Sequence, residues 1–280
     1  MREFKILRPL FAASNDHLNT ITQKKTIDAN KRTDTPLNLI LLSKEDLTGS
    51  DSRVVITGRR HKHIREFLKS AVGSELCVGL VGGKIGFGRV IAINDRSVEM
   101  EISLYEDPPL PVPGTLILAM PRPIVFNRLL GHITALGIKK IILIHSKRVE
   151  KSYWQSPVLK EENIKSQLIL ALEQAKDTIV PEIVRRMKFK SFIEDELPGI
   201  VKGTSAFVAH PPGAAGPLPY AIKGAFTLAI GPEGGFLSDE VAAFKCCGCK
   251  CVSLGDRILR VETAVVAALG RMIGQYRGED

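Results

Sequence analysis

The chain contains a single tryptophan among its 280 residues, and no apolar run approaches the length of about eighteen residues that a membrane-spanning helix needs. Its N-terminus lacks the charged-then-apolar pattern of a secretory signal. Acids stand among the bases of residues 1–36, whereas an organelle transit peptide is typically poor in acids. The sequence therefore predicts a cytoplasmic protein without a membrane anchor, and residues 1–36 are predicted to form a poorly ordered extension.

The five cysteines are too few and too clustered for a disulfide framework. An odd number of cysteines suits a reducing compartment. Cys246, Cys247, Cys249 and Cys251 lie close together in the sequence, but they lack the two separated pairs of a zinc ribbon. We predict no metal site and interpret these side chains as small apolar groups at a helix end and in the next strand.

The 30 acidic residues are outnumbered by 39 lysines and arginines, so the formal net charge is +9. Basic proteins of this size favour polyanionic partners. Between residues 53 and 69 the bases are dense, with Glu66 as the nearby acid, and this pattern is typical of nucleic-acid-binding surfaces. A solvated helix face is the alternative. The candidate RNA-binding residues are Arg53, Arg59, Arg60, Lys62, His63, Arg65 and Lys69.

Residues 37–107 are predicted to form a first domain, a small barrel of short strands with one helix at about residues 60–72. The predicted strands cover residues 39–42, 54–56, 76–81, 87–93 and 98–104. The helix is expected to bury Ile64, Phe67, Leu68 and Val72 and to leave the bases on its outer face. The glycine-rich tract at 79–88 lies between strands and lacks a phosphate-loop pattern, so we interpret it as a hairpin.

A proline-rich segment at residues 108–113 is predicted to be an extended linker, since each proline removes a backbone donor and restricts its neighbour. Strand and helix patterns then alternate through residues 114–280. The predicted strands cover residues 115–120, 140–144, 183–184, 206–209, 226–230 and 251–254, and helices are expected near residues 124–136, 160–175 and 265–273. This alternation indicates an α/β domain whose parallel sheet has helices on both faces.

Two glycine-bearing motifs near the C-terminus carry the most information. Residues 231–236 read Gly-Pro-Glu-Gly-Gly-Phe, and residues 254–264 read Leu-Gly-Asp-Arg-Ile-Leu-Arg-Val-Glu-Thr-Ala. Each follows a short apolar strand pattern and precedes a helix, with Ser238 expected to cap the first helix. Loops of this kind meet outside the carboxyl ends of parallel strands, where small ligands bind. The two motifs therefore predict one shared cofactor cleft.

The chemistry of these loops favours an adenosine-like cofactor over a triphosphate. Acids in the first turn after Ser238 disfavour a phosphate there, and no dinucleotide fingerprint is present. Because Gly255 has no side chain, its backbone can approach the ligand closely, while Ile258 and Leu259 can form apolar sides of the cleft. Arg260 and Glu262 lie where the last helix begins, and capping or ion pairing is the structural alternative for both.

At these motifs the sequence resembles the RsmE family, SPOUT-class methyltransferases that modify N3 of uridine in small-subunit (16S) ribosomal RNA. The resemblance covers about residues 37–275. Besides the two loops it includes residues 116–121, 135–137, 146–148 and the Glu173-Gln174 pair. It implies a PUA-like RNA-binding barrel, an S-adenosyl-L-methionine domain with a deep trefoil knot, and a homodimer acting in ribosome biogenesis.

The resemblance also implies site residues by position. Arg260 is the candidate that steadies the uracil anion, and Glu262 is the candidate that accepts a proton or orients Arg260. His210 and His132 are reserve bases. The cofactor is expected to contact Phe207, Val208, His210, Ile230, Gly231, Pro232, Gly234, Leu254, Gly255, Ile258, Leu259 and Arg260.

Two features depart from the family pattern. The segment after Glu173-Gln174 lacks the arginines that many members carry, and the extension before Leu37 is unmatched. Tyr153 and Trp154 are expected either to stack on a base or to pack internally. The alternatives to a uridine-N3 methyltransferase are a related enzyme for another RNA base and a non-catalytic RNA-binding assembly factor.

Overall fold

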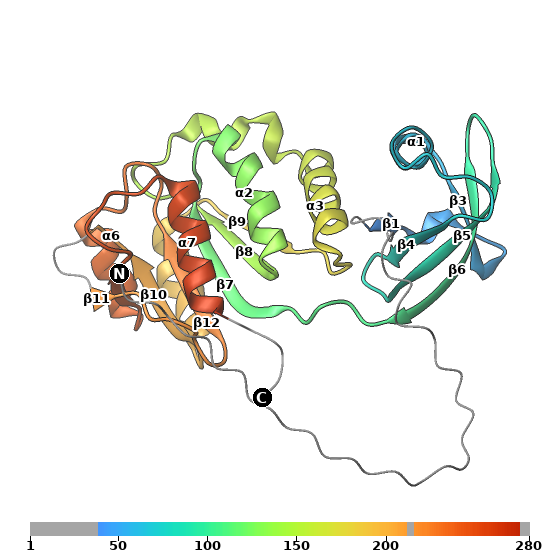
Figure 1. Ribbon diagram of the computed structural model, residues 1–280. Coiled ribbons are helices and arrows are strands. Elements are labelled where there is room, and N and C mark those ends of the chain that lie inside the picture. The colour runs from blue at the N-terminus through green and yellow to red at the C-terminus, as the bar shows by residue number, and fades with distance from the viewer. Residues whose placement is uncertain (1–38, 212–215, 275–280) are drawn as a thin grey trace, which may run out of the picture. The chain divides into compact units, whose positions relative to one another are not determined.

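The computed structural model describes residues 39–211 and 216–274, and these residues contain two β-sheets (Figure 1). The extension predicted at residues 1–36 lies outside the described residues. Among those described, no helix has the length and apolar character needed to cross a membrane.

The first sheet is curled and has the strand order β1-β4-β5-β6-β3-β2. Its pairs are antiparallel except for β1 with β4. One face buries an apolar core that includes Val54, Ile64, Val78 and Met100. The elements are β1 (Ile40–Leu42), β2 (Leu47–Thr48), β3 (Ser50–Ile56), α1 (Gly58–Lys62), β4 (Glu75–Leu80), β5 (Ile85–Ile93) and β6 (Val98–Glu106). The glycine-rich tract lies in the β4–β5 hairpin, as predicted.

The single helix expected at residues 60–72 is wrong in extent. Helix α1 begins at Gly58 and continues into one π-type turn at His63–Phe67, after which Lys69 takes a left-handed backbone conformation. Ile64 is buried as expected, but Phe67 is 74% exposed. The added residue in the π turn shifts the helical register, so the spacing that predicted one apolar face no longer holds.

The second sheet is parallel throughout, with the order β11-β13-β10-β12-β7-β8-β9. Strand β7 begins at Val112, inside the predicted linker. The strands are β7 (Val112–Ala119), β8 (Ile138–Ile144), β9 (Glu182–Arg186), β10 (Ser205–Ala209), β11 (Gly216–Pro217), β12 (Phe226–Ile230) and β13 (Lys250–Ser253). The helices are α2 (Pro123–Ala135), α3 (Glu161–Ala175), α4 (Phe189–Ser191), α5 (Leu197–Val201), α6 (Ser238–Cys246) and α7 (Val261–Ile273).

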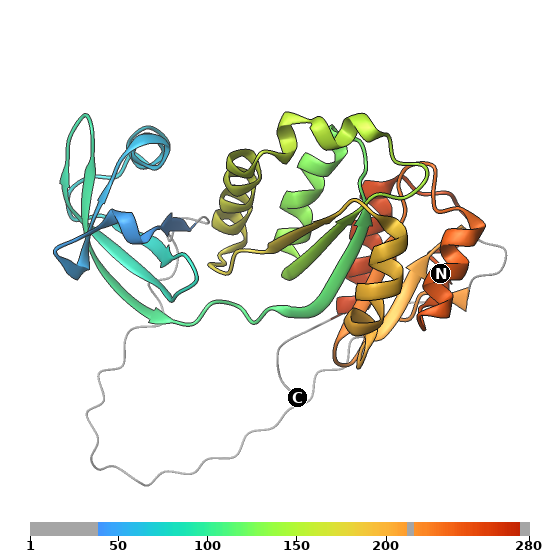
Figure 2. The ribbon, with the colours of Figure 1, turned by 180° about the vertical axis from the view of Figure 1, so that it is seen from behind.

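Helices cover both faces of this sheet, which explains its apolar strands. All five residues of β12 are buried, as expected for a strand between two helical layers. Helix α2 contacts both α3 and α7, whereas α5 and α6 pack on strands from the other side. Figures 1 and 2 show these two sets from opposite directions. The α/β class is confirmed, but the helical segment 189–201 was not predicted.

The chain order of the strands determines where the loops meet. Strand β10 lies between β12 and β13, and all three run in the same direction. Their following loops therefore emerge side by side at the carboxyl edge of the sheet. Gly114 in β7 permits close packing, because a Cβ there would lie 2.4 Å from the ring of Phe226.

The first sheet is joined to α3 by polar and apolar contacts. Oγ1 of Thr178 donates to the carbonyl oxygen of Gly83 at 2.6 Å, and the backbone N–H of Leu39 donates to the carbonyl oxygen of Glu173 at 2.9 Å. The Glu173 side chain accepts from the Arg59 guanidinium at 2.7 Å. Leu39, Leu41, Cys77 and Ile85 pack with Leu172 of α3. Glu173 of the Glu-Gln pair thus joins the two parts.

Candidate cofactor cleft

The loops after β10, β12 and β13 form one cleft of about 270 Å³. This volume is close to the lower end of the range of about 300–1000 Å³ that is common for small-molecule sites. The prediction that the two glycine motifs converge on one cleft is confirmed. The lining residues are Ala209, His210, Pro211, Ile230, Gly231, Pro232, Glu233, Gly234, Gly235, Ser253, Leu254, Gly255, Arg257, Ile258, Leu259, Val261 and Ala264.

Glycine is required at specific points of this cleft. Gly255 has φ = +121°, a conformation that other residues adopt at a cost of about 1–3 kcal/mol. A Cβ on Gly231 would lie 2.8 Å from the backbone nitrogen of Phe236, so the first loop folds tightly on itself. Gly255 is exposed and leaves its backbone N–H and C=O groups open to a ligand, whereas Gly231 is buried and permits the tight turn.

Four hydrogen bonds, made by the side chains of three residues, hold the first loop in place. Oε1 of Glu233 accepts from the backbone N–H of Arg122 at 3.0 Å, and the Arg148 guanidinium donates to the carbonyl oxygen of Gly234. The buried carboxylate of Glu240 accepts from the backbone N–H groups of Leu237 and Lys147 at 2.8 and 2.7 Å. Glu240 therefore links α6 to the loop after β8 and helps to fix the cleft.

The start of α6 differs from the prediction. Leu237, and not Ser238, occupies the N-cap position of the helix. The Glu240 carboxylate, at the third position of the helix, accepts from the backbone N–H of Leu237 at the N-cap.

The opposite side of the cleft is formed by His210 and the second loop. Nδ1 of His210 is buried and has no hydrogen-bond partner among the described residues. A buried polar atom of this kind usually has a partner. Ile258 is 86% exposed and Leu259 is half-buried. These apolar side chains and the adjacent backbone fit a ligand with both a flat apolar part and hydrogen-bonding groups.

Most predicted cofactor residues line the cleft, but three do not. Phe207 and Val208 are buried within β10, where the side chains of a strand interior point into the helical layers. Arg260 is exposed at the N-cap of α7, and Glu262 is half-buried in its first turn. Sequence reasoning missed Ala209, Pro211, Glu233, Gly235, Ser253, Arg257, Val261 and Ala264, although most adjoin predicted positions.

A polar cluster lies next to the cleft at the ends of β7 and β8. The Tyr153 hydroxyl donates to Oε1 of Glu150 at 3.0 Å. Partial burial raises the pKa of Tyr153, and the Glu150 carboxylate raises it further, whereas the Arg122 side chain lowers it. Because Glu233 contacts the backbone of Arg122, this cluster extends to the first glycine loop. The cluster joins residues far apart in the sequence, so no local pattern signals it.

The predicted basic surface of the first domain is partly occupied by ion pairs. Arg60 donates two hydrogen bonds to the Asp46 carboxylate and one to the carbonyl oxygen of Leu41, so the alternative of a solvated helix face does not hold for this residue. Arg65 pairs with Asp95 at 2.7 Å, and the His63 ring stacks on Phe67. Arg53, Lys62 and Lys69 are exposed.

His132 and the cysteines lie apart from the cleft. His132 is exposed near the end of α2. Burial, followed by the influence of Cys247, raises the pKa of the Cys249 thiol to about 12. Among the described residues, no group of three or more histidine, cysteine or acidic side chains is arranged to hold a metal ion.

The protein thus combines a curled sheet with an α/β domain. The parallel sheet of this domain carries a cleft, lined largely by loop backbone, at its carboxyl edge. Residues 108–273 match the model of a family described as the RNA methyltransferase domain. The chain belongs to this RNA methyltransferase family.

Individual proteins are similar over most of the chain. Ribosomal RNA small subunit methyltransferase E of Treponema pallidum is 29% identical over 237 residues, which cover 83% of this chain and 89% of the relative. The Synechocystis protein of the same name is 24% identical over 224 residues, covering 79% and 73%. Among solved structures, the Neisseria gonorrhoeae enzyme of that name, bound to S-adenosyl methionine, has a TM-score of 0.64 at 20% identity, with 83% and 95% covered.

Proposed function

We propose that this protein transfers a methyl group from S-adenosyl-L-methionine to N3 of uridine in small-subunit ribosomal RNA. The observation that carries the proposal is the cleft where the loops after β10, β12 and β13 converge, in a chain of the RNA methyltransferase family. The relatives named for small-subunit methylation, one of them with the cofactor bound, support this choice.

The residues of the cleft fit this cofactor. The exposed backbone at Gly255 can hydrogen-bond the polar edges of an adenosine, while Ile258 and Leu259 contact its faces. When bound, S-adenosyl-L-methionine supplies a sulfonium methyl group that is already activated for displacement, so the protein must chiefly align and deprotonate the acceptor. Alignment of this kind can contribute about 7–11 kcal/mol.

Arg260 and Glu262 are our candidates for the residues that stabilise and deprotonate the target uracil. Loss of the N3 proton places negative charge on O2 and O4, and a positioned arginine stabilises such charge. Glu262 follows two residues later at the start of α7, where it accepts the proton or orients Arg260. Each role requires the target base to leave its stack and enter the site.

We assign RNA binding to the first domain, residues 37–107, and describe it as PUA-like. Its curled sheet and its exposed bases Arg53, Lys62 and Lys69 support this assignment. Contacts from such bases go mainly to phosphates and supply affinity more than sequence choice.

We further propose a trefoil knot in the second domain. The connection between β10 and β12 is bonded to the end of the last helix: the backbone N–H groups of Ala221 and Ile222 donate to the carbonyl oxygens of Arg271 and Met272, at 2.9 and 2.7 Å. Nε of Arg271 donates to the carbonyl oxygen of Leu218 at 2.7 Å. These hydrogen bonds attach the end of α7 to residues 218–222, as we expect if the C-terminal segment passes through this connection.

We also propose that the protein acts as a homodimer. Ile124 at the start of α2, Ile258 in the second loop and Val266 in α7 are exposed, and all three follow the carboxyl edge of the sheet. Burial of these side chains against a second copy would stabilise an interface next to the cleft. Light scattering on the purified protein would show twice the chain mass.

Calorimetry and mass spectrometry test the proposed activity. The purified protein should bind S-adenosyl-L-methionine. It should also form 3-methyluridine in small ribosomal subunits isolated from cells that lack this protein. Absence of binding at millimolar cofactor would contradict the proposal and favour a non-catalytic assembly factor. A methyl group on another base would retain the cofactor site but refute the uridine assignment.

A further inference from the structure

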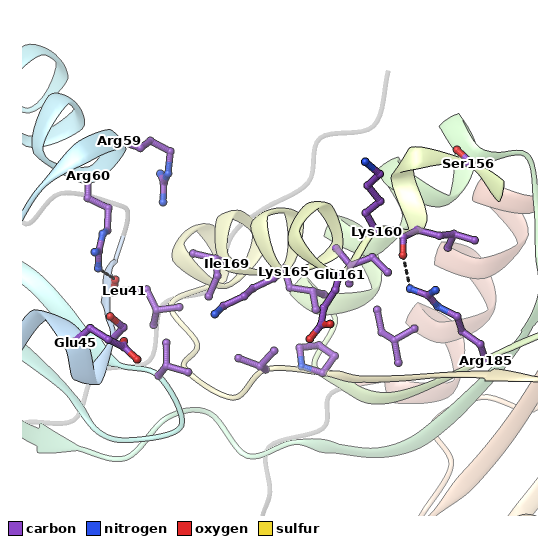
Figure 3. A pocket seen from close by; sticks show the side chains of 18 of the residues that line it. Leu41, Glu45, Arg59, Arg60, Ser156, Lys160, Glu161, Lys165, Ile169 and Arg185 are labelled. Carbon is purple, nitrogen blue, oxygen red and sulfur yellow. Dashed lines mark hydrogen bonds between the residues drawn. The ribbon is translucent and has the colours of Figure 1, made fainter. Parts of the chain in front are cut away.

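A second and larger hollow lies between the first sheet and the α3 side of the second domain. Its volume is about 1260 Å³, which is more than the roughly 1000 Å³ at the upper end of common small-molecule pockets. We call this hollow the groove. Figure 3 shows Arg59 and Arg60 on one side of the groove and Lys165 and Ile169 of α3 on the other.

Positive charge predominates along the groove. Six cationic side chains line it, against the two carboxylates of Glu45 and Glu161. The cationic residues are Lys44, Arg59, Arg60, Lys160, Lys165 and Arg185. Arg59 and Arg60 are paired with Glu173 and Asp46, whereas the three lysines are exposed.

Charges on the two walls of the groove influence each other. A hydrogen bond from Ser43 lowers the pKa of Glu45, and the positive charge of Lys165 lowers it further. Glu45 belongs to the first domain and Lys165 to α3. Lys165 is therefore near enough to interact with an anionic group on the opposite wall of the groove.

The floor of the groove is apolar. Leu41 and Val81 come from the first domain, and Leu168, Ile169 and Ile183 come from the second. A small anion would need only the cations, but a nucleic-acid strand presents phosphates together with flat base surfaces. Grooves that bind single-stranded nucleic acids combine these two features, cationic edges for the backbone and apolar or aromatic surfaces for the bases.

Trp154 connects the groove to the carboxyl edge of the second sheet. It lines the groove, and its Nε1 donates to Nδ1 of His145, directly after β8, at 2.9 Å. The neighbouring Tyr153 belongs to the polar cluster that reaches Glu233 in the cofactor cleft. A strand that passes Trp154 would thus leave the groove beside the cleft.

We infer that the groove holds a single-stranded segment of the substrate RNA and delivers the neighbouring target base to the cofactor cleft. This inference rests on the proposed function and extends it, because it assigns RNA contacts to the methyltransferase domain as well as to the first domain. Lys160 and Lys165 bind phosphates from the α3 side, and Trp154 stacks on a base at the end of the groove.

The test uses the full chain with Lys160→Gln and Lys165→Gln combined. The matched control combines Lys202→Gln with Lys245→Gln, two exposed lysines that do not line the groove. Binding of an oligouridylate of about twelve nucleotides is measured at several salt concentrations. Each lost phosphate contact lowers the salt slope by about 0.7 for single strands, so we expect the groove variant to lose about 1.4. The control should keep the wild-type slope.

The fluorescence of the only tryptophan supplies a second readout that does not depend on methyl transfer. We expect oligouridylate to quench Trp154, and added salt or the groove substitutions to reverse the quenching. An unchanged salt slope in the groove variant, or absence of quenching in wild-type protein that binds the RNA, would overturn the inference.

Cofactor binding separates this inference from the proposed function. The groove variant should bind S-adenosyl-L-methionine with wild-type affinity. Wild-type protein that binds oligouridylate in the groove but no cofactor would refute only the proposed activity. If the groove variant loses affinity for small subunits but not for oligouridylate, the groove holds a ribosomal protein and the inference is wrong.

Discussion

Replacing Gly255 with valine is the sharpest test of the cofactor cleft. Gly255 has φ = +121° and lines the cleft, and a Cβ built on it meets no described atom within 4 Å. The β-carbon of the valine would therefore meet no obstacle in the described part of the protein. It would strain the backbone and extend into the space that the ligand needs.

The expected magnitude follows from the backbone conformation. A non-glycine residue at this φ costs about 1–3 kcal/mol. If the loop relaxes to relieve the strain, only a fraction of the molecules keep the conformation that binds the cofactor. Since about 1.4 kcal/mol corresponds to a factor of ten, the affinity for the cofactor then falls about 5- to 150-fold. If the loop does not relax, the side chain blocks the cofactor directly. Either outcome weakens binding of S-adenosyl-L-methionine in calorimetry.

Gly248→Val is the matched control. Gly248 has φ = +92°, a Cβ there also meets no described atom within 4 Å, and the residue does not line the cleft. Both variants should lose a similar amount of stability against heat, but only Gly255→Val should lose cofactor affinity. Wild-type affinity in Gly255→Val, or an equal loss in both variants, would refute our assignment of the cleft.

Three further predictions concern buried groups. Glu240→Ala should lower the free energy of unfolding by about 2–4 kcal/mol, since two backbone N–H groups lose their acceptor. Glu240→Gln should lower it less. Equal denaturation midpoints for the wild type and the alanine variant would contradict this role of Glu240. Burial raises the pKa of Asp46, but hydrogen bonds from Arg60 and Ser43 outweigh it and hold the pKa below the ordinary 3.8. The stabilisation from Asp46 is thus present above this pH and lost as the pH falls below it, and Asp46→Asn should flatten the pH dependence of stability there; an unchanged profile would refute the pairing. Cys249, with a pKa of about 12, should resist alkylation at pH 8 in the native protein while exposed Cys246 reacts, as mass spectrometry would show; equal labelling would contradict its burial.

Local patterns predicted the second domain well. The strand at 226–230 was predicted with its observed bounds, because a short apolar run between turns leaves little choice for a strand buried on both faces. The glycines of the two motifs likewise required loops, and loops after parallel strands meet at one edge. The segment 189–201 was missed because it is built from two short helices around a π turn, without a sustained helical period.

Long-range contacts could not be predicted in the same way. Arg60 was expected on the outer face of its helix as an RNA-binding candidate, but Asp46, fourteen residues earlier, binds its guanidinium. Phe207 and Val208 were expected at the cofactor, yet their place inside β10 buries them beneath helices. Glu233 has an unremarkable place in the glycine motif, and its contact with the backbone of Arg122 spans 111 residues.

The amino-acid sequence alone determined the α/β class, the two loops that follow strands, and the positions in those loops where glycine is needed. These properties depend on local backbone preferences and apolar spacing, which act between near neighbours. Only the tertiary structure decided that β10 lies between β12 and β13, which cations are paired, and that a groove beside α3 leads toward the cleft. Those features depend on strand order and on contacts between distant segments, for which a single sequence carries no local signal.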